Sequence, residues 1–189
     1  MTKNLFIIAG ANGSGKSTLA SELLSEKKLE FLNADEIAKE INPENIEAVR
    51  ISAGKEVYKR LNNYFENKIS FAIETTLAGN NYLKTIKKAK ELDYKVSLIY
   101  TFVENPQICI QRINVRVLNG GHDIPDEDVI RRYYRSKNNF WNKYKDIVDD
   151  WDLFYNGISN YSLIARNEDG ELEILNDAIY NEFVKDISK

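Results

Sequence analysis

Short runs of apolar residues alternate along the chain with longer segments in which apolar residues return every three or four positions. The short runs are expected strands. The first of them, residues 5–9, is apolar throughout, which is typical of a parallel strand buried on both faces. The longer segments have the spacing of amphipathic helices. The alternation predicts an α/β protein with three layers, in which helices cover both faces of a mostly parallel central sheet.

The apolar pattern assigns most of the chain to strands and to the helices between them. Strands are expected at residues 5–9, 29–32, 70–74, 95–103, 153–155, 161–165 and 172–175. Helices are expected after the glycines near residue 10, from Glu36, at 43–67, 82–92 and 106–118, from Pro125 to about Val148, and from Asp177. No repeat or break in composition interrupts residues 1–189, so we expect a single domain in which residues 119–148 form a mobile flap, or lid.

The composition narrows the class of protein. The 189 residues include 26 basic and 29 acidic side chains, and the net charge of -3 argues against bulk electrostatic binding of nucleic acid. The one cysteine, Cys109, rules out a disulfide framework, and its place between two isoleucines fits a small core residue. No apolar run is long enough to cross a membrane or to form a signal peptide. We therefore expect a cytoplasmic protein that does not bind membranes.

A phosphate-binding loop is expected directly after the first strand. Residues 10–17 read GANGSGKS, which matches G-x-x-x-x-G-K-[ST] between a predicted strand and a predicted helix. Glycines allow the turns that aim backbone N–H groups at phosphate oxygens, whereas a glycine-rich turn without a ligand is the alternative. Lys16 would bind the β and γ phosphates of ATP or GTP, and the Ser17 hydroxyl would bind Mg²⁺. The expected nucleotide-binding residues are Gly10, Ala11, Asn12, Gly13, Ser14, Gly15, Lys16, Ser17 and Thr18.

Other motifs distinguish among proteins with such a loop. Guanine-nucleotide switches add N-K-x-D and D-x-x-G; residues 142–146 have the wrong spacing for the first, and no Asp is followed by Gly three residues later. The L-S-G-G-Q signature of transporter ATPases is missing, and the chain is short for an AAA+ module with a helical lid. A compact kinase remains. It needs a base for the acceptor hydroxyl and cations around the transferred phosphoryl group.

Carboxylates are expected at the ends of two strands beside this loop. Asp35 follows the second strand and is our candidate general base; capping the next helix is its alternative role, which Asn33 could also fill. Glu74 ends the third strand, and Thr75 and Thr76 follow it. These three residues are expected to orient a hydroxylated acceptor or a water molecule bound to Mg²⁺, and an ordinary loop is the alternative.

Arginines concentrate in the segment that follows. Arg112 and Arg116 share one face of a predicted helix, and Arg131 and Arg132 lie in the next one. Residues 120–122, Gly-Gly-His, join the two helices, and the histidine is expected to position the flap. The arginines could fold over a triphosphate as a lid, whereas a solvated basic face is the alternative.

The sequence indicates the binding site of the nucleotide base less clearly than that of the phosphates. Asn156 and Gly157 follow the strand at 153–155, where related kinases hold the base. Arg112 could stack on that base, because a planar guanidinium packs well on an aromatic ring.

The combination of motifs is more specific than any one of them. The motifs are GANGSGKS at 10–17, NADE at 33–36, IETT at 73–76, RVLNGGHDIP at 116–125 and RRYYRS at 131–136. In this order they resemble the zeta-toxin-like P-loop kinases, in particular their short stand-alone bacterial branch, described as predicted ATPases. The resemblance covers residues 4–167.

The resemblance implies a kinase that phosphorylates the 3′-hydroxyl of UDP-N-acetylglucosamine with ATP or GTP. The residues to which it assigns roles are Lys16 (phosphate), Asp35 (base), Glu74 (substrate side), and as catalytic arginines Arg116 with either Arg131 or Arg132. The family's second catalytic arginine lies at a spacing that this chain does not match exactly. The family's extended uridine-sugar pocket has no clear counterpart in this chain. One chain alone does not indicate an antitoxin partner.

Three functions stay open at this stage. The first is an ATP-dependent phosphotransferase acting on an alcohol group of a small acceptor. The second is a nucleic-acid-associated NTPase or polynucleotide 5′-kinase, favoured by the basic residues and interleaved aromatics of 131–145, although these aromatics have the spacing of core residues. The third is a nucleotide-sensing regulator without turnover.

Overall fold

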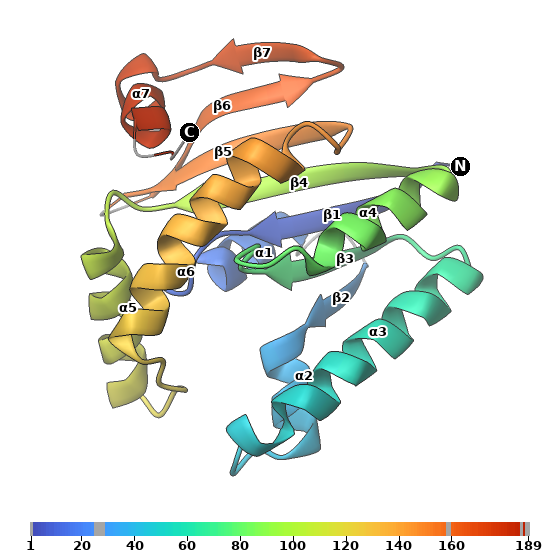
Figure 1. Cartoon of the computed structure of the whole chain (residues 1–189), viewed down its shortest axis with the longest axis vertical. Helices are drawn as coiled ribbons and strands as arrows, with labels where there is room; N and C mark the ends of the chain where they lie inside the picture. The colour runs from blue at the N-terminus through green and yellow to red at the C-terminus, as the bar shows by residue number, and fades with distance from the viewer. Residues whose placement is uncertain (1, 25–28, 158–159, 186, 188–189) are drawn as a thin grey trace.

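The computed structural model describes residues 2–24, 29–157, 160–185 and 187. The strands in this part of the chain are β1 Lys3–Ala9, β2 Glu30–Asn33, β3 Phe71–Thr75, β4 Tyr94–Phe102, β5 Asp150–Asn156, β6 Tyr161–Glu168 and β7 Glu171–Ile174. They form one sheet in the order β2-β3-β1-β4-β5-β6-β7 (Figure 1). Neighbouring strands from β2 to β5 are parallel and the last two pairs are antiparallel. The predicted α/β fold with a mostly parallel sheet is confirmed.

The helices agree with the predicted ones except at one start and at one end, since the helix expected to reach about Val148 ends at Asn139. Their bounds are α1 Lys16–Leu24, α2 Ala34–Ile41, α3 Arg50–Glu66, α4 Asn81–Glu91, α5 Pro106–Leu118, α6 Asp126–Asn139 and α7 Asp177–Lys185. The helix expected from residue 43 begins instead at Arg50, after a 3-10 turn at Glu47–Val49. The side chains of Asn42 and Asn45 accept backbone N–H groups of the following residues, which stabilises local turns over a continuous helix.

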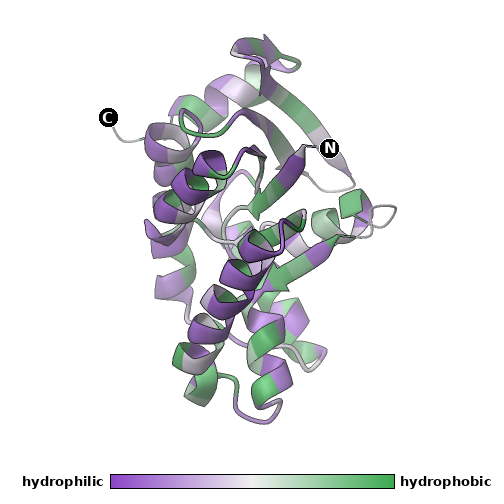
Figure 2. Ribbon diagram, turned by 90° about the vertical axis from the view of Figure 1, so that its right-hand side faces the viewer, coloured by the Kyte–Doolittle hydropathy of each residue, from purple (hydrophilic) through white to green (hydrophobic). Residues whose placement is uncertain are grey.

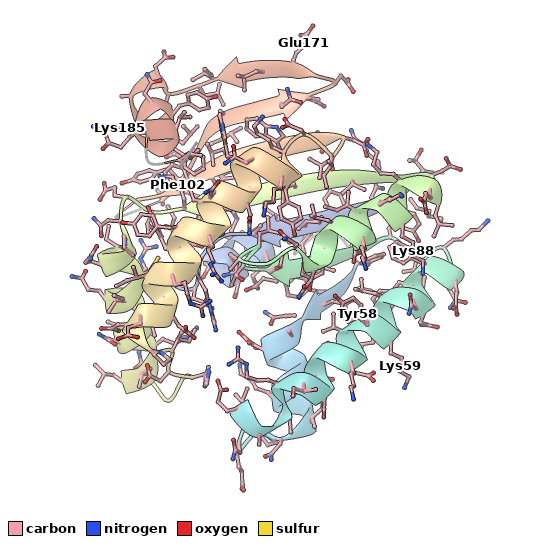
Figure 3. The ribbon with its side chains drawn as sticks, in the orientation of Figure 1. Tyr58, Lys59, Lys88, Phe102, Glu171 and Lys185 are labelled. Carbon is pink, nitrogen blue, oxygen red and sulfur yellow. The ribbon has the colours of Figure 1, made fainter. Side chains whose placement is uncertain are left out.

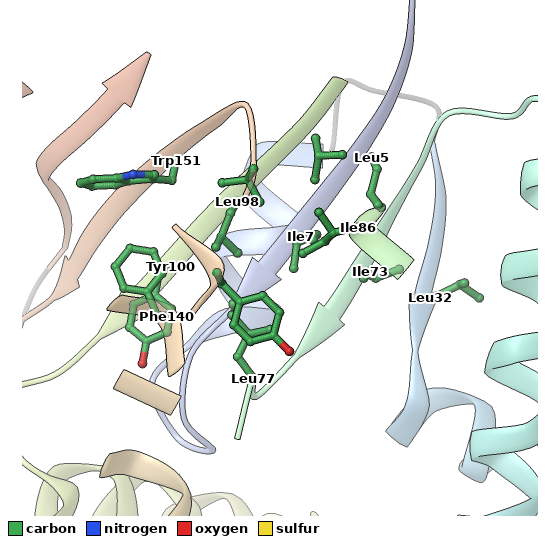
Figure 4. Packing of buried hydrophobic residues seen from close by; sticks show 14 of the residues in the cluster. Leu5, Ile7, Leu32, Ile73, Leu77, Ile86, Leu98, Tyr100, Phe140 and Trp151 are labelled. Carbon is green, nitrogen blue, oxygen red and sulfur yellow. The ribbon is translucent and has the colours of Figure 1, made fainter. Parts of the chain in front are cut away.

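Successive side chains of the central strands point to opposite faces of the sheet, and different helices cover each face. On one face Ile8 of β1 packs against Leu19 of α1. On the other face Ile7 and Leu98 belong to a larger cluster with residues of α3, α4 and α7 (Figure 4). In Figure 1, α4 and α6 lie in front of the sheet and α1 lies behind it. The result is the three-layer arrangement expected from the sequence.

The end of α6 is fixed in the main core. Its last residue is followed by a π-helical turn, Phe140–Tyr144, and both aromatic side chains that bound this turn are fully buried. Phe140 stacks on Tyr100 of β4 at a centroid distance of 4.4 Å, and Tyr100 also hydrogen-bonds Ser136 (Figure 4). Earlier in the same helix Val129 and Tyr133 are also buried, in a second apolar cluster with Cys109 and Ile113 of α5, so motion of the predicted flap, 119–148, stays a prediction.

The outer faces of the helices are mostly hydrophilic (Figure 2). Tyr58 and Lys59 project from α3, and the Lys88 ammonium of α4 lies 5.1 Å from the ring centre of Phe65 in α3 (Figure 3). Among the residues that the structure describes, no helix has the length and apolar character required to span a membrane.

Candidate active site

A cavity of about 380 Å³ opens where β1 and β3 end and α1 begins. Parallel strands end at the same edge of a sheet, so residues far apart in sequence meet there. The sequence-predicted residues that line the cavity are Asn12, Gly13, Gly15, Lys16, Ser17, Thr18, Asp35, Glu74, Arg112, Arg116 and Asn156, and Ile113 and Tyr161 lie beside them. The predicted phosphate loop, base and two of the four predicted arginines thus share one cavity.

The loop has the backbone that its glycines predict. Gly13 and Gly15 have φ angles of +79° and +98°, which side chains rarely adopt. The Asn156 side-chain amide donates to the carbonyl of Ser14 at 2.8 Å, and the Tyr161 hydroxyl donates to that of Gly15 at 2.7 Å. A Cβ at Gly15 would lie 2.2 Å from the first of these donors and 2.5 Å from the second. The ends of β5 and β6 therefore hold the loop through contacts that only glycine permits.

Lys16 is held beneath this loop with its charge largely out of water. The side chain is 7% exposed, and its ammonium donates to the carbonyl of Ala11 at 3.0 Å. Burial lowers the pKa of Lys16, and the carboxylates of Glu74 and Asp35 partly offset that effect. A buried cation with a lowered pKa gains most when an anion arrives. The loop therefore has a cation placed for phosphate.

Glu74 lies beside the first turn of α1. One carboxylate oxygen accepts from the Ser17 hydroxyl at 3.0 Å and lies 3.9 Å from the Lys16 ammonium. The other accepts from the Asn33 side-chain amide at 3.0 Å. A hydroxyl and a carboxylate oxygen are ligands that Mg²⁺ accepts. No cluster of three or more His, Cys, Asp or Glu ligands occurs in the described residues, so such an ion would need phosphate and water as further ligands.

Asp35 is free to face the cavity because another residue caps its helix. The side chain of Asn33 accepts the backbone N–H groups of Asp35 and Glu36, at 2.8 and 3.3 Å, and so fills the cap position of α2. Asp35 is exposed in the first turn of this helix and lines both the main cavity and a smaller one beside it. This geometry favours a site role for the Asp35 carboxylate over helix capping.

Helix α5 contributes two arginines to the cavity wall. Arg112 donates through Nη2 to the carbonyls of Asn156 and Gly157, at 3.2 and 3.0 Å, while its buried Nη1 has no hydrogen-bond partner among the described residues. The positive charge of Arg116 contributes to lowering the pKa of Lys16, so these two cations lie near each other. These hydrogen bonds join the Arg112 guanidinium to backbone carbonyls at the end of β5, and the predicted stacking of Arg112 on the nucleotide base stays a prediction.

The structure separates the two adjacent arginines of α6. Arg132 is 18% exposed; it donates to the side-chain oxygen of Asn12 in the loop at 3.2 Å and to Asp128 at 3.1 Å. Arg131 is 48% exposed, pairs with Asp128, and is absent from the described lining of both cavities beside Asp35. Only Arg132 of the pair is brought to the phosphate loop.

The predicted hydroxyls at the end of β3 stabilise a turn. The side-chain oxygens of Thr75 and Thr76 accept the backbone N–H groups of Leu77 and Ala78, at 3.1 and 3.4 Å. Neither threonine belongs to the described lining of the main cavity, whereas Glu74 does. The structure therefore separates these threonines from the carboxylate with which the sequence grouped them. Cys109 is fully buried, as predicted for a core residue.

Two features of the site were missed from the sequence. Tyr161 was assigned only to a strand, and its hydroxyl reaches the loop because it pairs with Asn156 across the β5–β6 ladder. Asn12 was assigned to the loop, but its contact with Arg132 joins residues 120 positions apart. Neither contact leaves a local signal in the sequence.

Comparison with known proteins identifies a family. The family model described as an AAA domain matches residues 5–136. A protein of Haemophilus influenzae named "Uncharacterized protein" is 35% identical over 133 residues, which cover 70% of this chain and 94% of that protein. The chain was expected to be too short for an AAA+ module with a helical lid. The match to residues 5–136 does not contradict this, because the described residues after 136 form the end of α6, its π-helical turn, β5–β7 and α7, and no helical bundle.

Solved structures share the three-layer α/β fold of this chain. A chain of the AvrRxo1-ORF1:AvrRxo1-ORF2 complex with sulphate ions matches all of this chain with a TM-score of 0.78 and 14% identity, and this chain spans 65% of that one. A structure of that complex with ATP matches with a TM-score of 0.76 and 15% identity, again over 65% of that chain. A structure from the PezAT toxin-antitoxin system of Streptococcus pneumoniae matches with a TM-score of 0.68 and 16% identity over 81% of that chain. At these identities the likeness concerns the fold.

Proposed function

Because the chain belongs to the AAA domain family and has a P-loop kinase-like fold, we propose that it is a phosphotransferase. It transfers the γ-phosphoryl group of ATP, or of GTP, to a hydroxyl group of a small acceptor. The observation that carries this proposal is one cavity lined by a phosphate loop, a buried lysine and an exposed aspartate. A nucleotide sensor needs the first two features but gains nothing from a carboxylate base beside them.

Each residue in the cavity has a separate task in the proposed reaction. Lys16 binds the β and γ phosphates, and Ser17 and Glu74 hold Mg²⁺, which would neutralise phosphate charge when bound. Asp35 accepts the proton of the acceptor hydroxyl as its oxygen attacks phosphorus. Arg116 and Arg132 neutralise charge that develops on the transferred group. Glu74 thereby moves from the acceptor side, where the resemblance put it, to the metal side, since its carboxylate contacts Ser17.

Substituting Gly15 should weaken nucleotide binding without unfolding the protein. We expect Gly15→Ala to reduce MgATP affinity by about tenfold or more, because the methyl group displaces the side chains of Asn156 and Tyr161 that hold the loop. Gly54→Ala is the matched control, since no atom lies within 4 Å of its Cβ position. Isothermal titration calorimetry measures both. Unchanged affinity in Gly15→Ala would contradict the described loop geometry.

The lowered pKa of Lys16 predicts proton uptake on nucleotide binding. Phosphate favours the charged ammonium and raises the pKa again, so binding takes up protons at pH values between the lowered and raised pKa. MgATP affinity should accordingly fall as the pH rises through the lowered pKa of Lys16. We expect proton uptake at alkaline pH in the wild type and none in Lys16→Arg, whose guanidinium stays charged. Calorimetry in two buffers of different ionisation enthalpy measures the protons, and no uptake by the wild type would contradict the prediction.

The adjacent arginines of α6 provide an internal comparison. Arg132→Ala should lower kcat by about 10- to 100-fold, because it removes the guanidinium that reaches the loop. Arg131→Ala should stay within about twofold of the wild type, because that side chain points to solvent. Initial rates of phosphoryl transfer measure both variants. Equal losses in the two variants would indicate a structural role for their shared partner, Asp128.

The chemistry of the site supports a small hydroxylated acceptor. A cavity of about 380 Å³ lies in the range of small-molecule sites, and the Asp35 carboxylate in its wall can accept a proton from a hydroxyl group. UDP-N-acetylglucosamine, the acceptor implied by the resemblance to zeta toxins, is one candidate. A toxin role with a cognate antitoxin is a further proposal of the same kind, supported by the likeness to a structure from the PezAT system.

The nucleic-acid alternative loses its main support. Of the aromatic side chains between residues 131 and 145, Tyr133, Phe140 and Tyr144 are buried in apolar clusters, Trp141 is partly buried, and Tyr134 is exposed. Buried rings offer no face for stacking bases. Lack of oligonucleotide binding at low salt would remove this alternative, and a steep loss of binding with added salt would revive it.

The direct test offers the protein ATP, Mg²⁺ and a panel of hydroxylated metabolites that includes UDP-sugars, sugars and nucleosides. Mass spectrometry then identifies any acceptor that gains a phosphoryl group. A phosphorylated small molecule is the expected result. Binding of ATP without any product across the panel would favour the nucleotide-sensing alternative.

A further inference from the structure

The turn between α5 and α6 folds back onto an arginine of the cavity. Gly120 has a φ angle of +82°, and the backbone N–H of Gly121 donates to the carbonyl of Arg116 at 2.9 Å. A Cβ at Gly121 would lie 2.5 Å from Cγ of Arg116, so glycine lets the turn pack directly on this side chain. The Gly-Gly sequence thereby brings His122 alongside the arginine.

His122 connects Arg116 to the opposite wall of the site. Its backbone carbonyl accepts from Nη2 of Arg116 at 2.6 Å. Its ring Nε2 lies 3.2 Å from Oε1 of Glu47, in the turn before α3. Arg50 also binds the Glu47 carboxylate, at 3.0 Å. The hydrogen bond from Arg50, and to a smaller extent His122, lowers the pKa of Glu47, so this partner is an anion at neutral pH.

The contact between His122 and Glu47 lies next to the candidate base. Both side chains line a cavity of about 40 Å³ that also has Asp35 and Arg132 in its wall. This volume corresponds to about one water molecule. The two walls of the site therefore meet beside the position where the acceptor hydroxyl and the transferred phosphoryl group would react.

We propose that His122 is a positioning residue, which fixes the turn through Glu47 and thereby holds the guanidinium of Arg116 toward the terminal phosphate of the bound nucleotide. The inference rests on the proposed function, because it requires a nucleotide in the main cavity. Arg116 lines that cavity and its charge acts on Lys16, so both cations face the same place. An arginine that is already held loses less rotamer freedom when the phosphate arrives.

Affinities for two nucleotides that differ in the terminal phosphate test this role. In His122→Ala, the affinity for Mg²⁺ with AMP-PNP should fall about 5- to 10-fold, while the affinity for ADP stays within about twofold. Glu47→Ala should give the same pattern, and the double variant no larger loss, because both single changes break the contact between His122 and residue 47. His122→Gln keeps an N–H donor for Glu47 and should restore most of the loss. Glu44→Ala, at an exposed glutamate of the same segment, is the matched control.

The possible outcomes distinguish a positioning role of His122 from a purely structural role. They also test His122 independently of the proposed reaction. An equal loss of affinity for ADP and AMP-PNP would overturn the positioning role of His122. So would an unchanged affinity for AMP-PNP in variants that melt at the wild-type temperature. If His122→Ala does not fold, Glu47→Ala decides by the same comparison. The affinities need no acceptor, so a wild type that binds AMP-PNP but transfers nothing would refute the proposed reaction and still leave the role of His122 measurable. Equal affinities of the wild type for ADP and AMP-PNP would also overturn the positioning role of His122.

Discussion

Asp35→Asn should reduce phosphoryl transfer by about 10²- to 10⁴-fold while leaving MgATP affinity within about threefold of the wild type. The amide has nearly the shape of the carboxylate but cannot accept the proton of the acceptor hydroxyl. Folding should not suffer, because Asn33, and not Asp35, caps α2 and the Asp35 side chain is exposed. Transfer rates and calorimetric affinities of the same preparations measure the separation of chemistry from binding.

The neighbouring carboxylate provides the control for this variant. Glu36 lies one residue further along α2, is exposed, and pairs with Lys39 at the surface. Glu36→Gln removes the same charge from the same turn and should keep transfer within about twofold of the wild type. Full transfer by Asp35→Asn would show that the proton goes elsewhere, and equal losses in both variants would point to the electrostatics of the helix end.

Lys16→Met should weaken MgATP binding by roughly 10- to 100-fold and lower turnover further. The lysine is the buried cation beneath the loop, and methionine keeps much of its length without the charge. Glu74 retains its hydrogen bonds from Ser17 and Asn33, so we expect the melting temperature to change little. Calorimetry and thermal unfolding measure the two effects.

A surface lysine controls for the loss of charge alone. Lys59 projects from α3, its side chain is 80% exposed, and it lies outside the described lining of the main cavity (Figure 3). Lys59→Met should leave MgATP affinity unchanged. If Lys16→Met also binds MgATP with full affinity, the loop is a turn that joins β1 to α1 and the nucleotide site must be sought elsewhere.

The fold was predictable because its signals are local. A continuous apolar run marks β1, proline and asparagine mark the start of α5, and the loop motif joins strand to helix with its own glycines. The start of α3 was not predicted, because side chains of two asparagines hold turns that the apolar spacing of residues 43–49 does not reveal. Local hydrogen bonding overrode the helical pattern there.

The sequence predicted the role of a site residue only where its motif leaves that residue a single common role. Lys16 and Ser17 have positions fixed by the loop motif, and both line the cavity. A threonine hydroxyl can bind a ligand or a backbone N–H, and at Thr75 it binds the backbone. The choice between Arg131 and Arg132 depends on how α6 packs, which the helical period alone does not determine. Contacts between distant segments needed the structure.

The fate of the terminal phosphoryl group tests the central claim most directly. Wild type and Asp35→Asn are incubated in single turnover with ATP labelled in its γ-phosphoryl group, Mg²⁺, and the panel of small hydroxylated acceptors. The account predicts that the wild type moves the label onto an acceptor and that the variant does so at least about 10²-fold more slowly. Label that remains on ATP, or leaves only as inorganic phosphate with every acceptor, would contradict it.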